Sequence, residues 1–180
     1  MKRVLSAVLI ALLFLSPCLT VCAGETEPET FASGDFTYVL LDDGTAEITK
    51  YKGKDKVLTL PSQLDHHSVT VIGDQAFAVC STLTSVTIPD SVTTIGDSAF
   101  TCCSSLTAIS IPDSVTAIWD AAFSCCFSLT AISIPDSITA IGGAAFSYCS
   151  NLTLTVGRNS YAAQYCKENG LNYTYPDSLD

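Results

Sequence analysis

Apolar residues recur along this chain at a fixed interval of 23 positions. The same interval separates phenylalanines, isoleucines and leucines, each type in its own register. These residues are Phe77, Phe100, Phe123 and Phe146; Ile72, Ile95, Ile118 and Ile141; and Leu83, Leu106, Leu129 and Leu152. Independent series that share one period predict a repeat protein in which each unit forms one coil of a solenoid.

The first half of a unit predicts a strand. Leu106, Ile109 and Ile111 have the spacing of a strand that buries alternate side chains after a bend and leaves Ser110 outside. Pro112 ends this strand, because proline has no N–H for a ladder hydrogen bond and favours a turn.

The second half of a unit predicts a short extended stretch followed by a helical turn. Val115 and Ile118 belong to the extended stretch, and Ala122, Phe123 and Cys126 have the spacing of a single helical turn. Because such a unit is too small to bury its own apolar side, the coils must stack. The predicted fold is a mainly β solenoid with short helical turns and one continuous core over residues 57–156.

An N-terminal β cap is predicted over residues 24–56. Residues 36–51 alternate apolar and polar side chains around Asp43-Gly44, a strong hairpin signal. The first coil that follows carries an insertion around residues 64–68. This insertion includes the only histidines, His66 and His67, and is predicted to be a solvated loop.

A C-terminal helix-strand cap is predicted over residues 157–180. Ser160 is a good N-cap for a helix over residues 161–169, and Gly170 ends that helix. A last strand is expected over residues 171–175. The helix should cover the open end of the apolar core.

The first 23 residues have the pattern of a secretory signal peptide. Lys2 and Arg3 precede an uncharged apolar run from Val4 to Leu15, and Ala23 closes a possible cleavage site. An uncleaved anchor is the alternative, but the run is short against the roughly 20 residues of a spanning helix. We therefore expect a secreted or cell-surface protein that is not inserted in a membrane after signal cleavage.

The charge of the chain restricts its partners. Removal of Lys2 and Arg3 would leave 6 basic and 18 acidic residues, a formal charge of −12. Such a chain would be repelled by nucleic-acid phosphates and by anionic membrane surfaces. No nucleic-acid partner is expected.

One repeat string resembles a known family. Residues 88–92, Ile-Pro-Asp-Ser-Val, run on through Ala99-Phe100 to Cys103, and this string is similar to the unit of BspA-like leucine-rich repeats of bacterial surface and secreted proteins. The resemblance covers residues 57–156 and implies a leucine-rich-repeat solenoid. It implies a non-enzymatic extracellular binding or adhesion module for a protein or glycan. The alternative is a structural cell-envelope spacer with no specific ligand.

Two aromatic residues depart from the repeat and are candidate binding residues. Trp119 stands where three other coils have glycine, and Phe127 stands where three other coils have serine. Large aromatics are enriched in binding hot spots. Harmless drift is the alternative for both.

The outward strand positions are a second set of candidates. They present small polar side chains in a regular array, which could contact a protein or a glycan or be ordinary solvent-facing positions. The candidates are Ser85, Thr87, Ser110 and Ser133.

The sequence offers little other chemistry. Cys102 and Cys125 occupy equivalent positions in adjacent coils and form a candidate disulfide. A second set, Cys80, Cys103, Cys126 and Cys149, is predicted to act as small buried hydrophobes. No catalytic residue, metal site or cofactor is predicted. Calcium bound by the ladder Asp74, Asp97 and Asp120 is a minor alternative.

Overall fold

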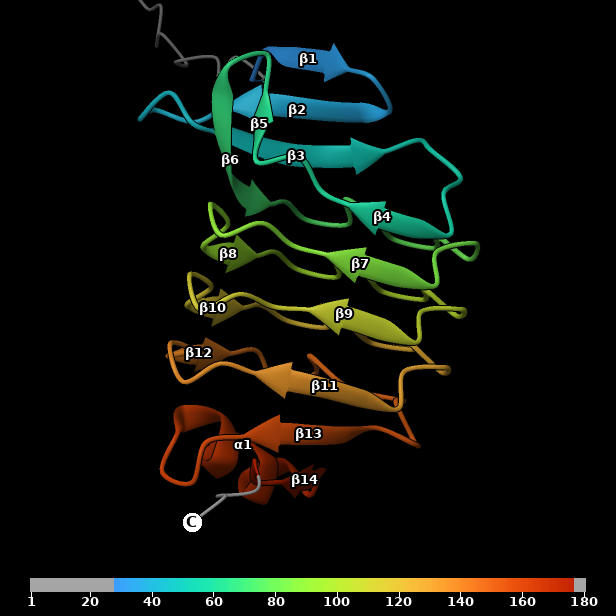
Figure 1. Cartoon of the computed structure of the whole chain (residues 1–180), viewed down its shortest axis with the longest axis vertical. Coiled ribbons are helices and arrows are strands. Elements are labelled where there is room, and N and C mark those ends of the chain that lie inside the picture. The colour runs from blue at the N-terminus through green and yellow to red at the C-terminus, as the bar shows by residue number, and fades with distance from the viewer. Residues whose placement is uncertain (1–27, 177–180) are drawn as a thin grey trace, which may run out of the picture.

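The computed structural model describes residues 28–176, which form a stack of coils closed by a different cap at each end (Figure 1). The predicted signal peptide, residues 1–23, lies outside the described residues. The strands are β1 (Thr30–Ser33), β2 (Phe36–Leu40), β3 (Ala46–Tyr51), β4 (Val57–Thr59), β5 (Gln63–Leu64), β6 (His67–Ile72), β7 (Ser85–Thr87), β8 (Thr94–Ile95), β9 (Ala108–Ser110), β10 (Ala117–Ile118), β11 (Ala131–Ile134), β12 (Ala140–Ile141), β13 (Thr153–Val156) and β14 (Asn172–Thr174). The helix α1 spans Tyr161–Asn169.

Each coil contributes one strand to each of two parallel arrays. The first array contains β4, β7 and β9 and continues with β11, β13 and β14, as Figure 1 shows. The second array runs β6, β8, β10, β12 and continues into the N-terminal hairpin. Equivalent residues pair in register, so that Ile118 lies between Ile95 and Ile141. The two strands expected in each unit are confirmed.

Tight turns replace the helical turn that the spacing predicts on the third side of each coil. Ala121 and Cys125 have positive φ angles of 54° and 59°, which interrupt any helical run. Between these turns, backbone N–H groups point to the next coil: Phe123 donates to Ala145 O at 2.8 Å. The third side is therefore hydrogen-bonded from coil to coil without forming regular strands.

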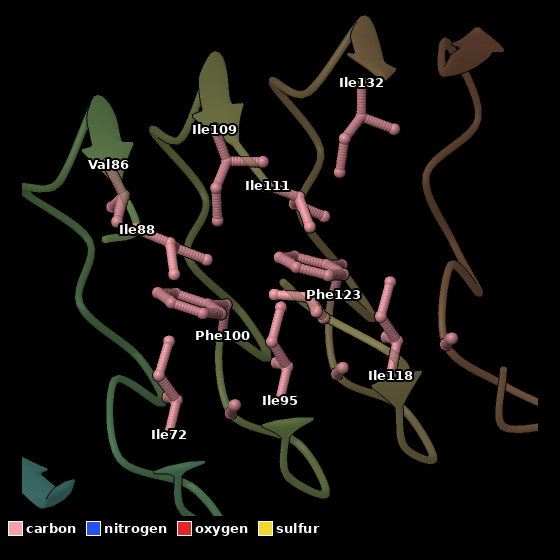
Figure 2. Packing of buried hydrophobic residues seen from close by; sticks show 14 of the residues in the cluster. Ile72, Val86, Ile88, Ile95, Phe100, Ile109, Ile111, Ile118, Phe123 and Ile132 are labelled. Carbon is pink, nitrogen blue, oxygen red and sulfur yellow. The ribbon is translucent and has the colours of Figure 1, made fainter. Parts of the chain in front are cut away.

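A column of stacked aromatic rings occupies the centre of the solenoid. Phe100 lies 4.9 Å from Phe77 and 5.4 Å from Phe123, measured between ring centroids, and all three rings are fully buried. Figure 2 shows the rings between isoleucines and valine that converge from the two strand arrays. Tyr51 and Tyr165 close the column in the N-terminal and C-terminal caps.

The N-terminal cap is the antiparallel unit β1-β2-β3, and the hairpin predicted within residues 36–51 is confirmed. The insertion in the first coil is a second hairpin, β5-β6, and not the expected loop. Asp65 and His66 form its turn with positive φ angles of 44° and 72°. The Asp65 carboxylate accepts hydrogen bonds from the hydroxyls of Ser33 and Tyr38, each at 2.9 Å. These bonds connect the insertion to the N-terminal cap.

The C-terminal cap follows the prediction. The Ser160 hydroxyl accepts the N–H of Ala163 at 3.1 Å, and Gly170 ends α1 in the left-handed conformation. Strand β14 then pairs with β13. Over residues 28–176, no helix combines the length and apolar character that crossing a bilayer requires.

Candidate binding surfaces

The outer side of the first strand array, here called the strand face, is lined by uncharged side chains. In β7, β9 and β11 the apolar residue at the centre of each strand is buried, and its neighbours point outward. The outward residues are Val57, Thr59, Ser85, Thr87, Ala108, Ser110, Ala131, Ser133, Thr153, Thr155, Asn172 and Thr174. All four strand candidates from the sequence therefore lie together on this face.

Some hydroxyl groups away from the strand face bond from one coil to the next. The Thr107 side chain donates to Thr84 O at 3.0 Å, and Thr116 bonds to the preceding coil in the same way. These threonines connect neighbouring coils. By contrast, the hydroxyls of Ser110 and Ser133 have no hydrogen-bond partner among residues 28–176, so they remain available to a ligand.

Trp119 and Phe127 are exposed but do not lie on the strand face. Trp119 is 47% exposed and directly follows β10, whereas Phe127 is 56% exposed and precedes β11. They lie at opposite ends of the third side of their coil. Both are accessible to a partner, and their role in recognition stays a prediction.

The glycine positions explain why Trp119 is unusual. A Cβ on Gly96 would lie 2.9 Å from the backbone nitrogen of Asp74 in the preceding coil, and a Cβ on Gly142 would collide with the backbone nitrogen of Asp120. Glycine thus allows close coil-to-coil contact at this position. The packing of the repeat does not require an indole there.

The aspartate ladder is explained by backbone hydrogen bonds. Asp74 Oδ1 accepts the N–H of Asp97 at 2.8 Å, Asp97 Oδ1 accepts that of Asp120 at 2.9 Å, and Asp120 Oδ1 accepts that of Gly143 at 2.7 Å. Within the described part of the chain, no cluster of three or more His, Cys, Asp or Glu side chains is arranged to hold a metal ion. The carboxylates thus have a structural role that sequence reasoning did not identify.

The inner cysteines are more than small hydrophobes. The Cys103 thiol donates to Phe77 O at 3.1 Å and the Cys126 thiol to Phe100 O at 3.2 Å, and both residues are fully buried. Burial raises the pKa of Cys103 to about 12 and that of Cys126 well above its usual range. Cys80 and Cys149 are only partly buried.

A second exposed series was missed at the sequence level. Val79 and Tyr148 are 67% and 76% exposed, and they occupy the same repeat position as Cys102 and Cys125. We call these four residues the ridge. Their common spacing of 23 residues was the available signal, but their different chemical types obscured it.

Comparison with known proteins identifies a family model and several solved relatives. The model of the BspA type leucine rich repeat region matches residues 56–168 in six copies. A leucine-rich repeat protein from Bacteroides capillosus is 32% identical, with 71% of this chain and 98% of that chain covered and a TM-score of 0.65. The T. pallidum leucine rich repeat protein TpLRR is 31% identical, with 71% of each chain covered and a TM-score of 0.60. A search of curated proteins found no match.

Proposed function

The chain belongs to the BspA-type leucine-rich repeat family, and on this premise we propose that it is a non-enzymatic binding module that acts outside the cell. Its partner is an extracellular protein or glycan that contacts the strand face. The observation that carries this proposal is the set of outward hydroxyls, such as those of Ser110 and Ser133, that have no partner among the described residues.

The strand face suits a partner that offers many hydrogen bonds. Neighbouring strands lie about 4.8 Å apart, so each hydroxyl is repeated at a regular step along the solenoid. Serine and threonine side chains have few rotamers, which keeps the entropic cost of fixing them small. Because the face carries no charge, hydrogen bonding and shape, and not ion pairing, would determine its affinity.

The proposed location outside the cell rests on the sequence. The signal-peptide pattern of residues 1–23 supports export, and the excess of acidic residues favours solubility at a secreted or cell-surface location. A direct test is fractionation of the native source with mass spectrometry of the N-terminus. A chain that begins at Met1 and stays inside the cell would contradict export.

The proposed binding is tested with a charged variant of the strand face. The purified chain is screened against arrayed glycans and purified extracellular matrix proteins, and the double change Ser110→Arg, Ser133→Arg should weaken any binding found by at least tenfold, about 1.4 kcal/mol. The matched control, Gln75→Arg with Ala144→Arg, makes the same charge change on the third side and should bind normally. Equal loss in both variants would contradict a strand-face site. No retained ligand at any salt concentration would favour the spacer function.

The aromatic residues are tested separately. The double change Trp119→Gly, Phe127→Ser restores the residues of the other coils and should alter the free energy of unfolding by less than about 1 kcal/mol. If the two aromatics are a hot spot, affinity for the partner should fall more than tenfold. Unchanged affinity in the folded variant would leave the strand face as the remaining candidate.

A further inference from the structure

The ridge places two cysteines side by side on the outside of adjacent coils. Cys102 is exposed and Cys125 is partly exposed, and both have free thiols. The residues at the same position in the flanking coils, Val79 and Tyr148, are more than half exposed. The side chain at this position therefore points to solvent, and not into the core.

The backbone around this pair is hydrogen-bonded from coil to coil. The N–H of Cys102 donates to Ser124 O at 2.8 Å, which in a parallel pairing places Cys102 opposite Cys125. The paired strands set the step between stacked coils at about 4.8 Å, which for equivalent residues lies within the window of about 4.4–6.8 Å that a disulfide requires between Cα atoms. The φ angles are 57° and 59°, so the two side chains leave the backbone in the same direction.

Two of the inner cysteines, Cys103 and Cys126, cannot compete for this bond in the folded chain. Cys103 and Cys126 follow directly after the ridge cysteines, but their thiols point inward and donate to the carbonyls of Phe77 and Phe100. Both are fully buried. Cys125 is thus the accessible cysteine at the position equivalent to Cys102 in the next coil.

We infer that Cys102 and Cys125 form a coil-to-coil disulfide under oxidising conditions. The thiolate of one cysteine attacks a small disulfide such as oxidised glutathione and releases one glutathione thiol. The second cysteine, after losing its proton, displaces the other glutathione from this mixed disulfide. One small disulfide is consumed, and two glutathione thiols are released for each bond formed. Its occurrence in nature rests on the proposed export, because extracellular conditions are oxidising.

The purified chain in graded mixtures of reduced and oxidised glutathione tests this inference without depending on export or on a ligand. We expect the monomer to lose two hydrogens in intact mass, and tandem mass spectrometry should locate the link between residues 102 and 125. The variant Cys125→Ser should not lose two hydrogens, and its Cys102 should instead carry at most one glutathione. A disulfide-linked dimer, a different internal pair, or two stably glutathionylated cysteines would overturn the inference.

The repeat provides matched controls for the geometry. The double change Val79→Cys, Cys125→Ser moves the pair one coil toward the N-terminus, where the N–H of residue 79 donates to Thr101 O at 2.9 Å, and a bond to Cys102 should form. The change Tyr148→Cys, Cys125→Ser leaves cysteines two coils apart. That separation, roughly 9.6 Å, exceeds the reach of a disulfide. Circular dichroism confirms that each variant is folded. Equal bond formation in both variants would overturn the inference that adjacent coils set the separation of the two cysteines.

Discussion

Replacing Phe100 with alanine should lower the free energy of unfolding by about 3–5 kcal/mol. The Phe100 ring is fully buried between Phe77 and Phe123, and its removal leaves a cavity that rigid neighbouring coils cannot fill. Loss of the stacking contacts with both rings adds to the cost. Thermal or denaturant unfolding followed by circular dichroism measures this change.

Two further variants distinguish cavity formation from general disturbance of the coil. Phe100→Leu retains much of the volume and should cost clearly less than the alanine change. Val79→Ala shortens an exposed side chain in the neighbouring coil and should have an effect within about 0.5 kcal/mol. Similar values for all three variants would show that the phenylalanine column is not the centre of the core.

The core could be predicted from the sequence because each of its apolar positions recurs in every coil. Phe77 or Ile72 alone would be an ordinary apolar residue, but a position that stays apolar in every coil must face the axis of the stack. Both caps were also predictable, since Asp43-Gly44 and the pair Ser160 and Gly170 have specific turn and capping chemistry. These signals are local, and the hairpin and the helix caps form where the local sequence predicts them.

The third side of the coil was not predictable in the same way. The spacing of Ala122, Phe123 and Cys126 fits a helical turn as well as it fits two successive tight turns. Hydrogen bonds to the next coil, such as that from Phe123 N–H to Ala145 O, stabilise the tight turns. A short window of sequence does not contain these bonds, because their acceptors lie in another coil. Positive φ at alanine and cysteine also gives no compositional signal, because glycine is the usual marker of that conformation.

The candidate site was only partly predictable for a related reason. The sequence identifies serines and threonines at regular positions, but it does not distinguish Thr107, which bonds to the preceding coil, from Ser110, which has no partner among the described residues. Likewise, residue type alone does not show that the Asp97 carboxylate accepts a backbone hydrogen bond from the next coil. The direction and the hydrogen-bond partner of a side chain, and not its residue type, distinguish the residues that connect coils from the candidate binding residues.

Alkaline pH should destabilise the fold steeply because of the buried thiols. In the unfolded chain Cys103 has a pKa near the ordinary value of 9.0, whereas in the folded chain burial raises this pKa to about 12. The folded state therefore holds the thiol proton more tightly, and the resulting stability is fully present below pH 9. It is lost as the pH rises from 9 toward 12, at about 1.4 kcal/mol per pH unit for this one thiol. Cys126 should add a loss in the same direction, since its pKa is also raised by burial.

Denaturant unfolding between pH 8 and pH 10.5, with a reductant present to exclude disulfides, measures this loss. The variant Cys103→Ala has no thiol to titrate at this position, so its stability should fall less steeply above pH 9 by about 1.4 kcal/mol per pH unit. Thr93→Ala removes a hydrogen-bonding side chain on the surface and should lower stability without changing the slope. The slope, and not the stability at one pH, is decisive, because cavity formation in Cys103→Ala displaces the whole curve. If wild type and Cys103→Ala have parallel curves, the Cys103 thiol is ionised as easily in the folded chain as in the unfolded chain.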